Sequence, residues 1–199
     1  GFTPGISWNP PAWSISTEAA AYLLFPLLIV GAKWDKRSTG LLVFVSVALL
    51  GALHALFSLH GYDRLGADIA RLGLARCLIE FSLGTILCVL WRRWGHRRYA
   101  APLAALLALA TLGVGLAGSL PETAFVPLAL AAALLALAWD KGWIARMLGA
   151  RVPHWLGEVS YSTYLGHYFL LVLFKIAFVD ASLQMGFGQL AGYLLLVLV

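Results

Sequence analysis

Charged side chains are scarce in this sequence. Asp, Glu, Lys and Arg make up 12% of its 199 residues, whereas a typical soluble domain contains roughly 25%. Hydrophobic residues reach 61%, and the mean hydropathy is +0.86. A soluble globular domain is therefore excluded. At about 20 residues per span, six or seven membrane helices fit with short loops and leave no room for a soluble domain.

Cysteine is nearly absent too, with only Cys77 and Cys88 present. On one predicted helix they would lie about 16 Å apart, which is too far for a disulfide. The sequence also lacks His or Cys residues at metal-ligand spacing and lacks a glycine-rich phosphate-binding loop. We therefore expect neither a bound metal nor a bound cofactor.

The net charge of +5 does not indicate a nucleic-acid partner, because the basic residues gather at alternate ends of the apolar segments. Ten of the 14 Lys and Arg fall in the segments 33–37, 92–98 and 141–151. Cytoplasmic loops of membrane proteins carry such an excess, and Trp concentrates at the two interfaces, where all 8 tryptophans of this chain are expected. The three basic segments are therefore predicted to lie in the cytoplasm, with Gly1 outside.

The apolar pattern predicts an all-α polytopic bundle of about seven transmembrane helices in a single domain, residues 1–199. The predicted spans are 17–32, 40–59, 72–91, 99–119, 123–139, 159–179 and 187–199. Residues 140–158 are expected to form a polar loop. No basic segment precedes the first apolar run and the first residue is Gly1, so we expect a fragment without a visible signal peptide.

The densest group of polar residues opens the first span. Ser16 or Thr17 is expected to cap the helix, which places Glu18 in the first turn at the positive end of the helix dipole. Tyr22 shares a face with Glu18 one turn further on. Pro26 has no N–H, so the carbonyl of Tyr22 loses its intrahelical partner and the helix is expected to bend. A carboxylate, a phenol and a carbonyl would then line one side.

The same stretch also has a purely structural interpretation. Glu18 would only complement the helix dipole, and Trp13 would anchor the helix at the membrane interface. The residues alone leave both interpretations open.

Arg76 and Glu80 lie inside the third span, where ionised groups are costly and hence candidates for function. Their spacing of four places them on one helix face as an ion pair. The pair could equally be structural. If the first and third spans are neighbours, Glu18, Arg76 and Glu80 would form a polar pocket that opens outward.

The sixth span carries Ser160, Tyr164 and His167 on one face, with Tyr161 beside them. His167 is expected near mid-membrane, where a neutral imidazole needs a partner. A hydrogen-bonded packing role is the alternative for His167, and His54 in the second span is a weaker candidate.

Three segments resemble motifs of the membrane-bound acyltransferase 3 family. Pro-Ala-Trp-Ser-Ile-Ser-Thr-Glu at 11–18, followed by Tyr-Leu-Leu-Phe-Pro at 22–26, is similar to its Trp-Ser-Leu-Ser-Val-Glu signature. Residues 76–84 resemble its Arg-x-x-x-Glu-Phe-x-x-Gly helix, and residues 156–167 its Leu-Gly-x-x-Ser-Tyr-x-x-Tyr-Leu-x-His helix. The resemblance covers essentially the whole chain and matches the later half of a family member.

This resemblance implies transfer of an acyl group, commonly acetyl, from cytoplasmic acyl-coenzyme A to a hydroxyl of a cell-envelope saccharide or another exported acceptor. It implies O-acetylation, such as polysaccharide modification, at a bacterial inner (plasma) membrane. Membrane lipids, the glycan acceptor and the donor acyl-coenzyme A are the expected partners. The family's Arg-to-His motif with its best candidate base lies upstream of the tryptophan motif and is not in this sequence, so this chain alone is expected to be inactive.

On this basis Glu18 and His167 are the candidate catalytic residues. The candidate substrate-binding residues are Trp13, Ser14, Ser16, Tyr22, Arg76, Glu80, Ser160, Tyr161 and Tyr164. A transporter or flippase-like module is the alternative function, since intramembrane charges and proline-bent helices suit it equally. A non-catalytic membrane scaffold is a further alternative.

Overall fold

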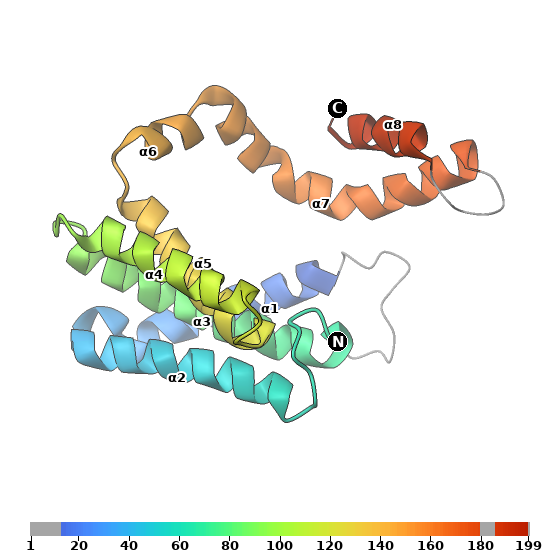
Figure 1. Cartoon of the computed structure of the whole chain (residues 1–199). Helices are drawn as coiled ribbons and strands as arrows, with labels where there is room; N and C mark the ends of the chain where they lie inside the picture. Colours follow the sequence, from blue (N-terminus) through green and yellow to red (C-terminus); the bar gives the residue numbers. More distant parts are fainter. Residues whose placement is uncertain (1–12, 180–185, 199) are drawn as a thin grey trace. The chain divides into compact units, whose positions relative to one another are not determined.

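A computed structural model describes residues 13–179 and 186–198. Every regular element in these ranges is helical, so the expected all-α fold of a polytopic membrane protein is confirmed (Figure 1). The chain divides into two compact units, of which the first includes Ile15–Ala145 and the second Arg146–Val199. Gly1, Trp8 and the first residues of the tryptophan motif lie outside the described residues.

Five long helices build the first unit. They are α1 (Trp13–Ala32), α2 (Thr39–Ser58), α3 (Ile69–Trp94), α4 (Ala100–Leu116) and α5 (Glu122–Trp139), with the 3₁₀ turn η2 (Trp34–Lys36) after α1. Four segments are long and apolar enough to cross a membrane: α1 with η2, α2, α3 and α5. The helix α4 is apolar but shorter, with 17 residues.

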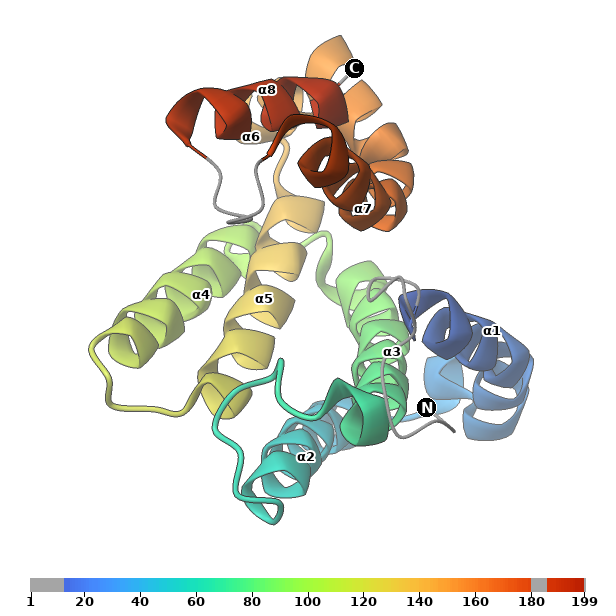
Figure 2. The same cartoon turned by 90° about the vertical axis from the view of Figure 1, so that its right-hand side faces the viewer.

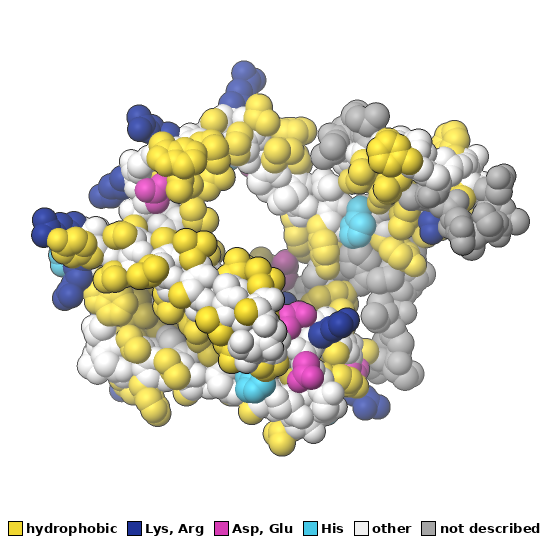
Figure 3. Space-filling view, in the orientation of Figure 1, with side chains coloured by type: hydrophobic (Ala, Val, Ile, Leu, Met, Phe, Trp, Pro, Cys, Tyr) yellow, Lys and Arg dark blue, Asp and Glu magenta, His cyan; other side chains and the backbone are white. Residues whose placement is uncertain are grey.

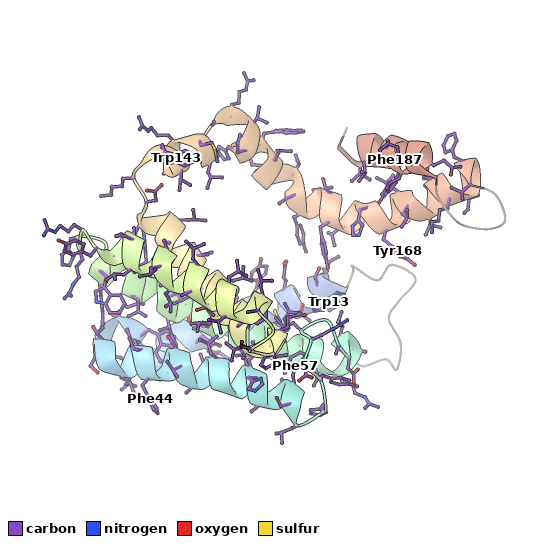
Figure 4. The ribbon with its side chains drawn as sticks, in the orientation of Figure 1. Trp13, Phe44, Phe57, Trp143, Tyr168 and Phe187 are labelled. Atoms are coloured by element: carbon purple, nitrogen blue, oxygen red, sulfur yellow. The ribbon has the colours of Figure 1, made fainter. Side chains whose placement is uncertain are left out.

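The helix α3 packs against both α2 and α5, and α5 in turn packs against α4 (Figure 2). Buried side chains of α2 and α3 form one core cluster, which contains Leu42, Leu83, Ile86, Leu87 and Leu90. A second cluster surrounds the fully buried Phe57, whereas Phe44 lies on the outer side of α2 and is 68% exposed (Figure 4). Exposed apolar side chains such as Phe44 are suited to contact with lipid.

The contact between α4 and α5 depends on a glycine. Gly115 is buried, and a Cβ added there would lie 2.2 Å from the ring of Phe125. Small residues at such contacts let membrane helices approach closely. The side chain of Phe125 therefore occupies the space that Gly115 leaves open.

The basic segments of the first unit come together at one end. The guanidinium of Arg93, near the end of α3, donates to the carbonyls of Asp35 (2.8 Å) and Arg37 (2.7 Å). The indole of Trp139, at the end of α5, donates to the carbonyl of Trp91 at 2.9 Å. The segment at 33–37 therefore meets the end of α3, which in turn lies beside the last turn of α5.

The second unit contains α7 (Arg151–Phe178) and α8 (Phe187–Leu198), which pack side by side. The ring of Phe174 lies 5.8 Å from that of Tyr193, and the Tyr193 hydroxyl donates to the carbonyl of His167 at 2.7 Å. This hydrogen bond ties α8 to the middle of α7.

The prediction of a polar loop over residues 140–158 is wrong. The short helix α6 (Trp143–Leu148) occupies part of it, and α7 already begins at Arg151. Pro153 falls in the first turn of α7, where its missing N–H costs no intrahelical hydrogen bond. Arg146 and His154 lie on helices instead, whereas Lys141 precedes α6.

The predicted cap of the first helix is also wrong. Because α1 includes Trp13, Ser16 and Thr17 lie inside the helix, and Glu18 lies beyond its first turn. Thr17 is buried, while Ser16 is exposed. The helix also continues through Pro26.

Candidate functional site

The predicted ion pair in α3 is present. The Nε of Arg76 lies 3.0 Å from the Oε1 of Glu80, and the two side chains are 27% and 37% exposed. Their spacing of four places them one turn apart on the same face, as predicted. Since both groups are only partly exposed, each lowers the cost of holding the other inside the helix bundle.

Arg76 also binds the segment between α2 and α3. Its Nη1 donates to the carbonyl of Leu65 at 3.0 Å, and the N–H of Leu65 donates to the carboxylate of Glu122 at 3.2 Å. Leu65 itself is buried in the core cluster around Phe57. Two charged side chains from α3 and α5 thus hold both backbone groups of one buried residue. Sequence reasoning missed this role of Glu122, although an acid in the first turn of a helix is a recognisable signal.

A cavity of about 250 Å³ adjoins the ion pair between α3 and α5. Arg76, Glu80 and Gly84 line it from α3, whereas α5 contributes Pro127 and apolar side chains. An apolar pocket with a few converging polar groups is the usual form of a small-molecule site, although this one is slightly smaller than the range of about 300–1,000 Å³. Its size suits a small polar group.

The helix α1 contacts a neighbouring face of α3. The rings of Tyr22 and Phe25 meet the ring of Phe81 edge-on, with centroid distances of 6.5 and 5.8 Å. The hydroxyl of the buried Thr17 is hydrogen-bonded to the thiol of Cys77. The first and third spans are therefore neighbours, which was the condition for a shared polar site.

Glu18 lies near the ion pair but not in contact with it. Glu18, Arg76 and Glu80 are all close enough to Cys77 to interact with it electrostatically. The ion pairs among the described residues are Arg76–Glu80 and the surface pair Arg71–Asp68, so the half-buried Glu18 has no cation at salt-bridge distance there. The carboxylate of Glu18 is thus less constrained than that of Glu80, which is paired with Arg76.

The remaining candidates on α1 differ in exposure. Ser16 and Tyr22 are exposed, whereas Trp13 and Ser14 are half-buried. The structure therefore holds Tyr22 through its contact with Phe81 while leaving most of the side chain accessible.

The polar side chains of α7 belong to the second unit, and those with assigned hydrogen bonds contact their own helix. The Ser160 hydroxyl donates to the carbonyl of Gly157 at 2.7 Å, and Nδ1 of His167 is hydrogen-bonded to the carbonyl of Tyr164. Because a carbonyl only accepts, Nδ1 is the donor in this hydrogen bond. Tyr164 and Tyr161 lie partly exposed on the same helix.

His54 has a partner in another helix. Its Nδ1 lies 2.9 Å from the hydroxyl of Thr123, which is 1% exposed, and the N–H of Thr123 donates to the carbonyl of Asp63 at 3.3 Å. These contacts join α2, α5 and the segment between α2 and α3. They give His54 a structural role that its sequence position did not show.

Within the described ranges, no group of three or more His, Cys, Asp or Glu side chains could hold a metal ion. No curated protein and no solved structure matches the chain. The family model of the acyltransferase domain, in contrast, matches residues 1–199, so the match extends over both units and includes all three sequence motifs. The chain belongs to the acyltransferase 3 family of membrane acyltransferases.

Proposed function

We propose that this membrane acyltransferase transfers an acyl group, commonly acetyl, from acyl-coenzyme A to a hydroxyl of a cell-envelope saccharide. The observation that carries the proposal is the Arg76–Glu80 pair beside a cavity between apolar helices, in a chain that matches the family along its whole length. Charged groups retained inside a membrane bundle favour a polar ligand.

The ion pair suits the recognition of a hydroxyl-rich acceptor. Arg76 uses Nε for Glu80 and Nη1 for Leu65, so its remaining N–H groups are left to donate to sugar oxygens. The carboxylate of Glu80 accepts from Arg76 through Oε1, and its second oxygen is suited to accept from a sugar hydroxyl. Donor and acceptor groups side by side match the pattern of a saccharide.

Glu18 is the proposed general base. Glu18 is half-buried and has no cation at salt-bridge distance among the described residues, whereas Glu80 is bound to Arg76. In the reaction, the acceptor hydroxyl loses its proton to Glu18 as its oxygen bonds to the thioester carbonyl carbon. The carbon–sulfur bond then breaks, and coenzyme A leaves as a thiol after taking up a proton.

The proposed orientation follows from charge. The basic segments that meet at the ends of α3 and α5 would face the cytoplasm, where acyl-coenzyme A is found. The opposite end of the first unit, which carries Leu65, Arg76 and Glu122, would face outward, where an exported saccharide is accessible.

The test measures transfer of labelled acetyl from acetyl-coenzyme A to envelope saccharide in membranes that carry this chain co-expressed with the family's upstream helices, since the chain alone is expected to be inactive. Glu18→Gln should lower the rate by about 10²–10⁴-fold, the usual contribution of a general base. Glu158→Gln, which neutralises an exposed glutamate on α7, is the matched control and should leave the rate nearly unchanged. Absence of labelled saccharide in the unsubstituted protein would overturn the function. Normal transfer by Glu18→Gln would overturn only the assignment of the base.

A further inference from the structure

A second cavity of the first unit shares no lining residue with the one beside the Arg76–Glu80 pair and plays no part in the proposed reaction. It has a volume of about 710 Å³ and lies where the end of α3, the beginning of α4 and the last turns of α5 meet. This volume is within the range of about 300–1,000 Å³ that is usual for ligand sites. The cavity therefore requires an explanation of its own.

The wall of the cavity is apolar along α4 and α5. Leu103 and Leu107 line it from α4, and Ala132 and Leu135 from α5. Leu103 is 63% exposed, so this wall continues onto the outer surface of α4. Hydrocarbon from the bilayer can cover such a surface, whereas a water-soluble ligand would leave it exposed.

One end of the cavity is basic. Arg97 and Arg98 line it there, directly before α4 begins. Leu107 lies about 10 Å along α4 from its first residue, since an α-helix rises 1.5 Å per residue. Figure 3 shows basic side chains gathered where α3 passes into α4. The cavity thus combines a cationic end with an apolar interior.

No described acid neutralises these two arginines. Neither Arg97 nor Arg98 forms an ion pair in the described ranges, and the guanidinium of Arg98 stacks on the ring of Tyr99 at 4.4 Å. Asp140 lies at the same end, but its two oxygens accept from the N–H groups of Gly142 (3.0 Å) and Ala145 (2.8 Å). Arg97 and Arg98 remain available to an anionic ligand.

The length of α4 supports a lipid as that ligand. Its 17 residues rise about 26 Å, which is less than the hydrocarbon thickness of about 30 Å. A short span requires thinning of the bilayer or basic and aromatic side chains that reach to the interface. Arg97, Arg98 and Tyr99 are such side chains, and they would meet phosphate groups at that depth.

We propose that this cavity binds an anionic phospholipid, with its phosphate held by Arg97 and Arg98 and one acyl chain between α4 and α5. Basic pockets between membrane helices bind anionic headgroups, and arginine forms paired hydrogen bonds with phosphate oxygens. The anionic headgroup distinguishes this ligand from the zwitterionic bulk lipid. The proposal does not depend on the acyl-transfer reaction.

The test uses tryptophan fluorescence, because Trp94 and Trp139 both line the cavity. The protein is reconstituted in phosphatidylcholine vesicles that contain a minority of phosphatidylglycerol, with brominated chains on one lipid at a time. Bromine quenches nearby indoles, so brominated phosphatidylglycerol should quench more than the same amount of brominated phosphatidylcholine. Trp94→Phe should reduce this excess.

Further variants distinguish binding in the cavity from general attraction of anionic lipid to surface charge. Arg97→Gln and Arg98→Gln should each lower the affinity for the anionic lipid by about fivefold, since a basic residue near the membrane surface contributes about 1 kcal/mol to binding. Arg92→Gln removes the same charge from the same basic segment, but Arg92 does not line this cavity, so the excess quenching should remain. Ala100→Phe should reduce it by filling the cavity without a change of charge.

Three outcomes would overturn the proposal. The excess quenching could be absent, or Arg92→Gln could abolish it as completely as Arg97→Gln does. Palmitoyl-coenzyme A or inorganic phosphate could also displace the brominated lipid at equal ionic strength, which would assign the cavity to the thioester donor or to a free anion.

Discussion

In α3 the side chain of Arg76 reaches another segment of the chain, whereas in α7 the side chains of Ser160 and His167 bond to their own helix backbone. Arg76 contacts both Glu80 and the carbonyl of Leu65, which precedes α3. In α7, Ser160 and His167 have hydrogen bonds only three residues back along the same helix. The two helices share the same kind of sequence motif but use it differently.

Because of this difference, substitutions in the two helices should affect stability and activity differently. A substitution in α3 leaves a half-buried charge or carbonyl without a partner, so it should change stability together with activity. A substitution in α7 removes a bond that the side chain made with its own helix, so it should change activity with little effect on stability. Each prediction below tests one side of this comparison.

Arg76→Ala should have the largest effect. It leaves the carboxylate of Glu80 and the carbonyl of Leu65 unpaired, so we expect a loss of about 1–3 kcal/mol in the free energy of unfolding. Misplacement of the acceptor should lower transfer by about 10²-fold. Unfolding in a denaturing detergent and the acetyl-transfer assay measure the two effects.

The matched control for Arg76 lies on the same helix. The side chain of Arg71 is 80% exposed, and its Nε is 3.9 Å from Asp68. Exposed pairs contribute about 0–1 kcal/mol, so Arg71→Ala should differ little from the unsubstituted protein. Equal losses of stability in Arg76→Ala and Arg71→Ala would show that the contacts of Arg76 with Glu80 and Leu65 do not stabilise the fold.

Four of the predicted spans coincide with helices long and apolar enough to cross a membrane, because apolar runs of about 20 residues match the bilayer. The helical character of residues 143–148 and of the beginning of α7 was missed, because Lys141, Arg146 and His154 suggested a loop. A helix at a membrane surface carries basic side chains without cost, and Pro153 in its first turn does not interrupt it. Charge density alone does not distinguish such a helix from a loop.

The site shows the same limit. The spacing of Arg76 and Glu80 was sufficient to predict their ion pair, because both lie on one helix. The contact of Glu122 with Leu65, which are 57 residues apart, and that of His54 with Thr123 depend on how α2, α3 and α5 pack. A single sequence does not contain that information in any local pattern.

His167→Ala tests the other side of the comparison. The bond of His167 to the Tyr164 carbonyl is local, and its own carbonyl accepts from Tyr193 whatever the side chain, so stability should fall by less than about 1 kcal/mol. Because Glu18 is the proposed base, transfer should fall by less than about tenfold. A fall of about 10²–10⁴-fold would instead identify the Nε2 of His167 as the general base.

Ser160→Ala should have the smallest effect on the fold. The hydroxyl of Ser160 donates to the carbonyl of Gly157, a helical carbonyl that has its own intrahelical donor, and the side chain is exposed. The free energy of unfolding should therefore change by no more than about 0.5 kcal/mol. If Ser160 binds the acceptor, KM for the acceptor should rise by about fivefold, the equivalent of one hydrogen bond, while kcat stays nearly constant. A loss of stability as large as that of Arg76→Ala would show that α7, like α3, depends on its polar side chains for its fold.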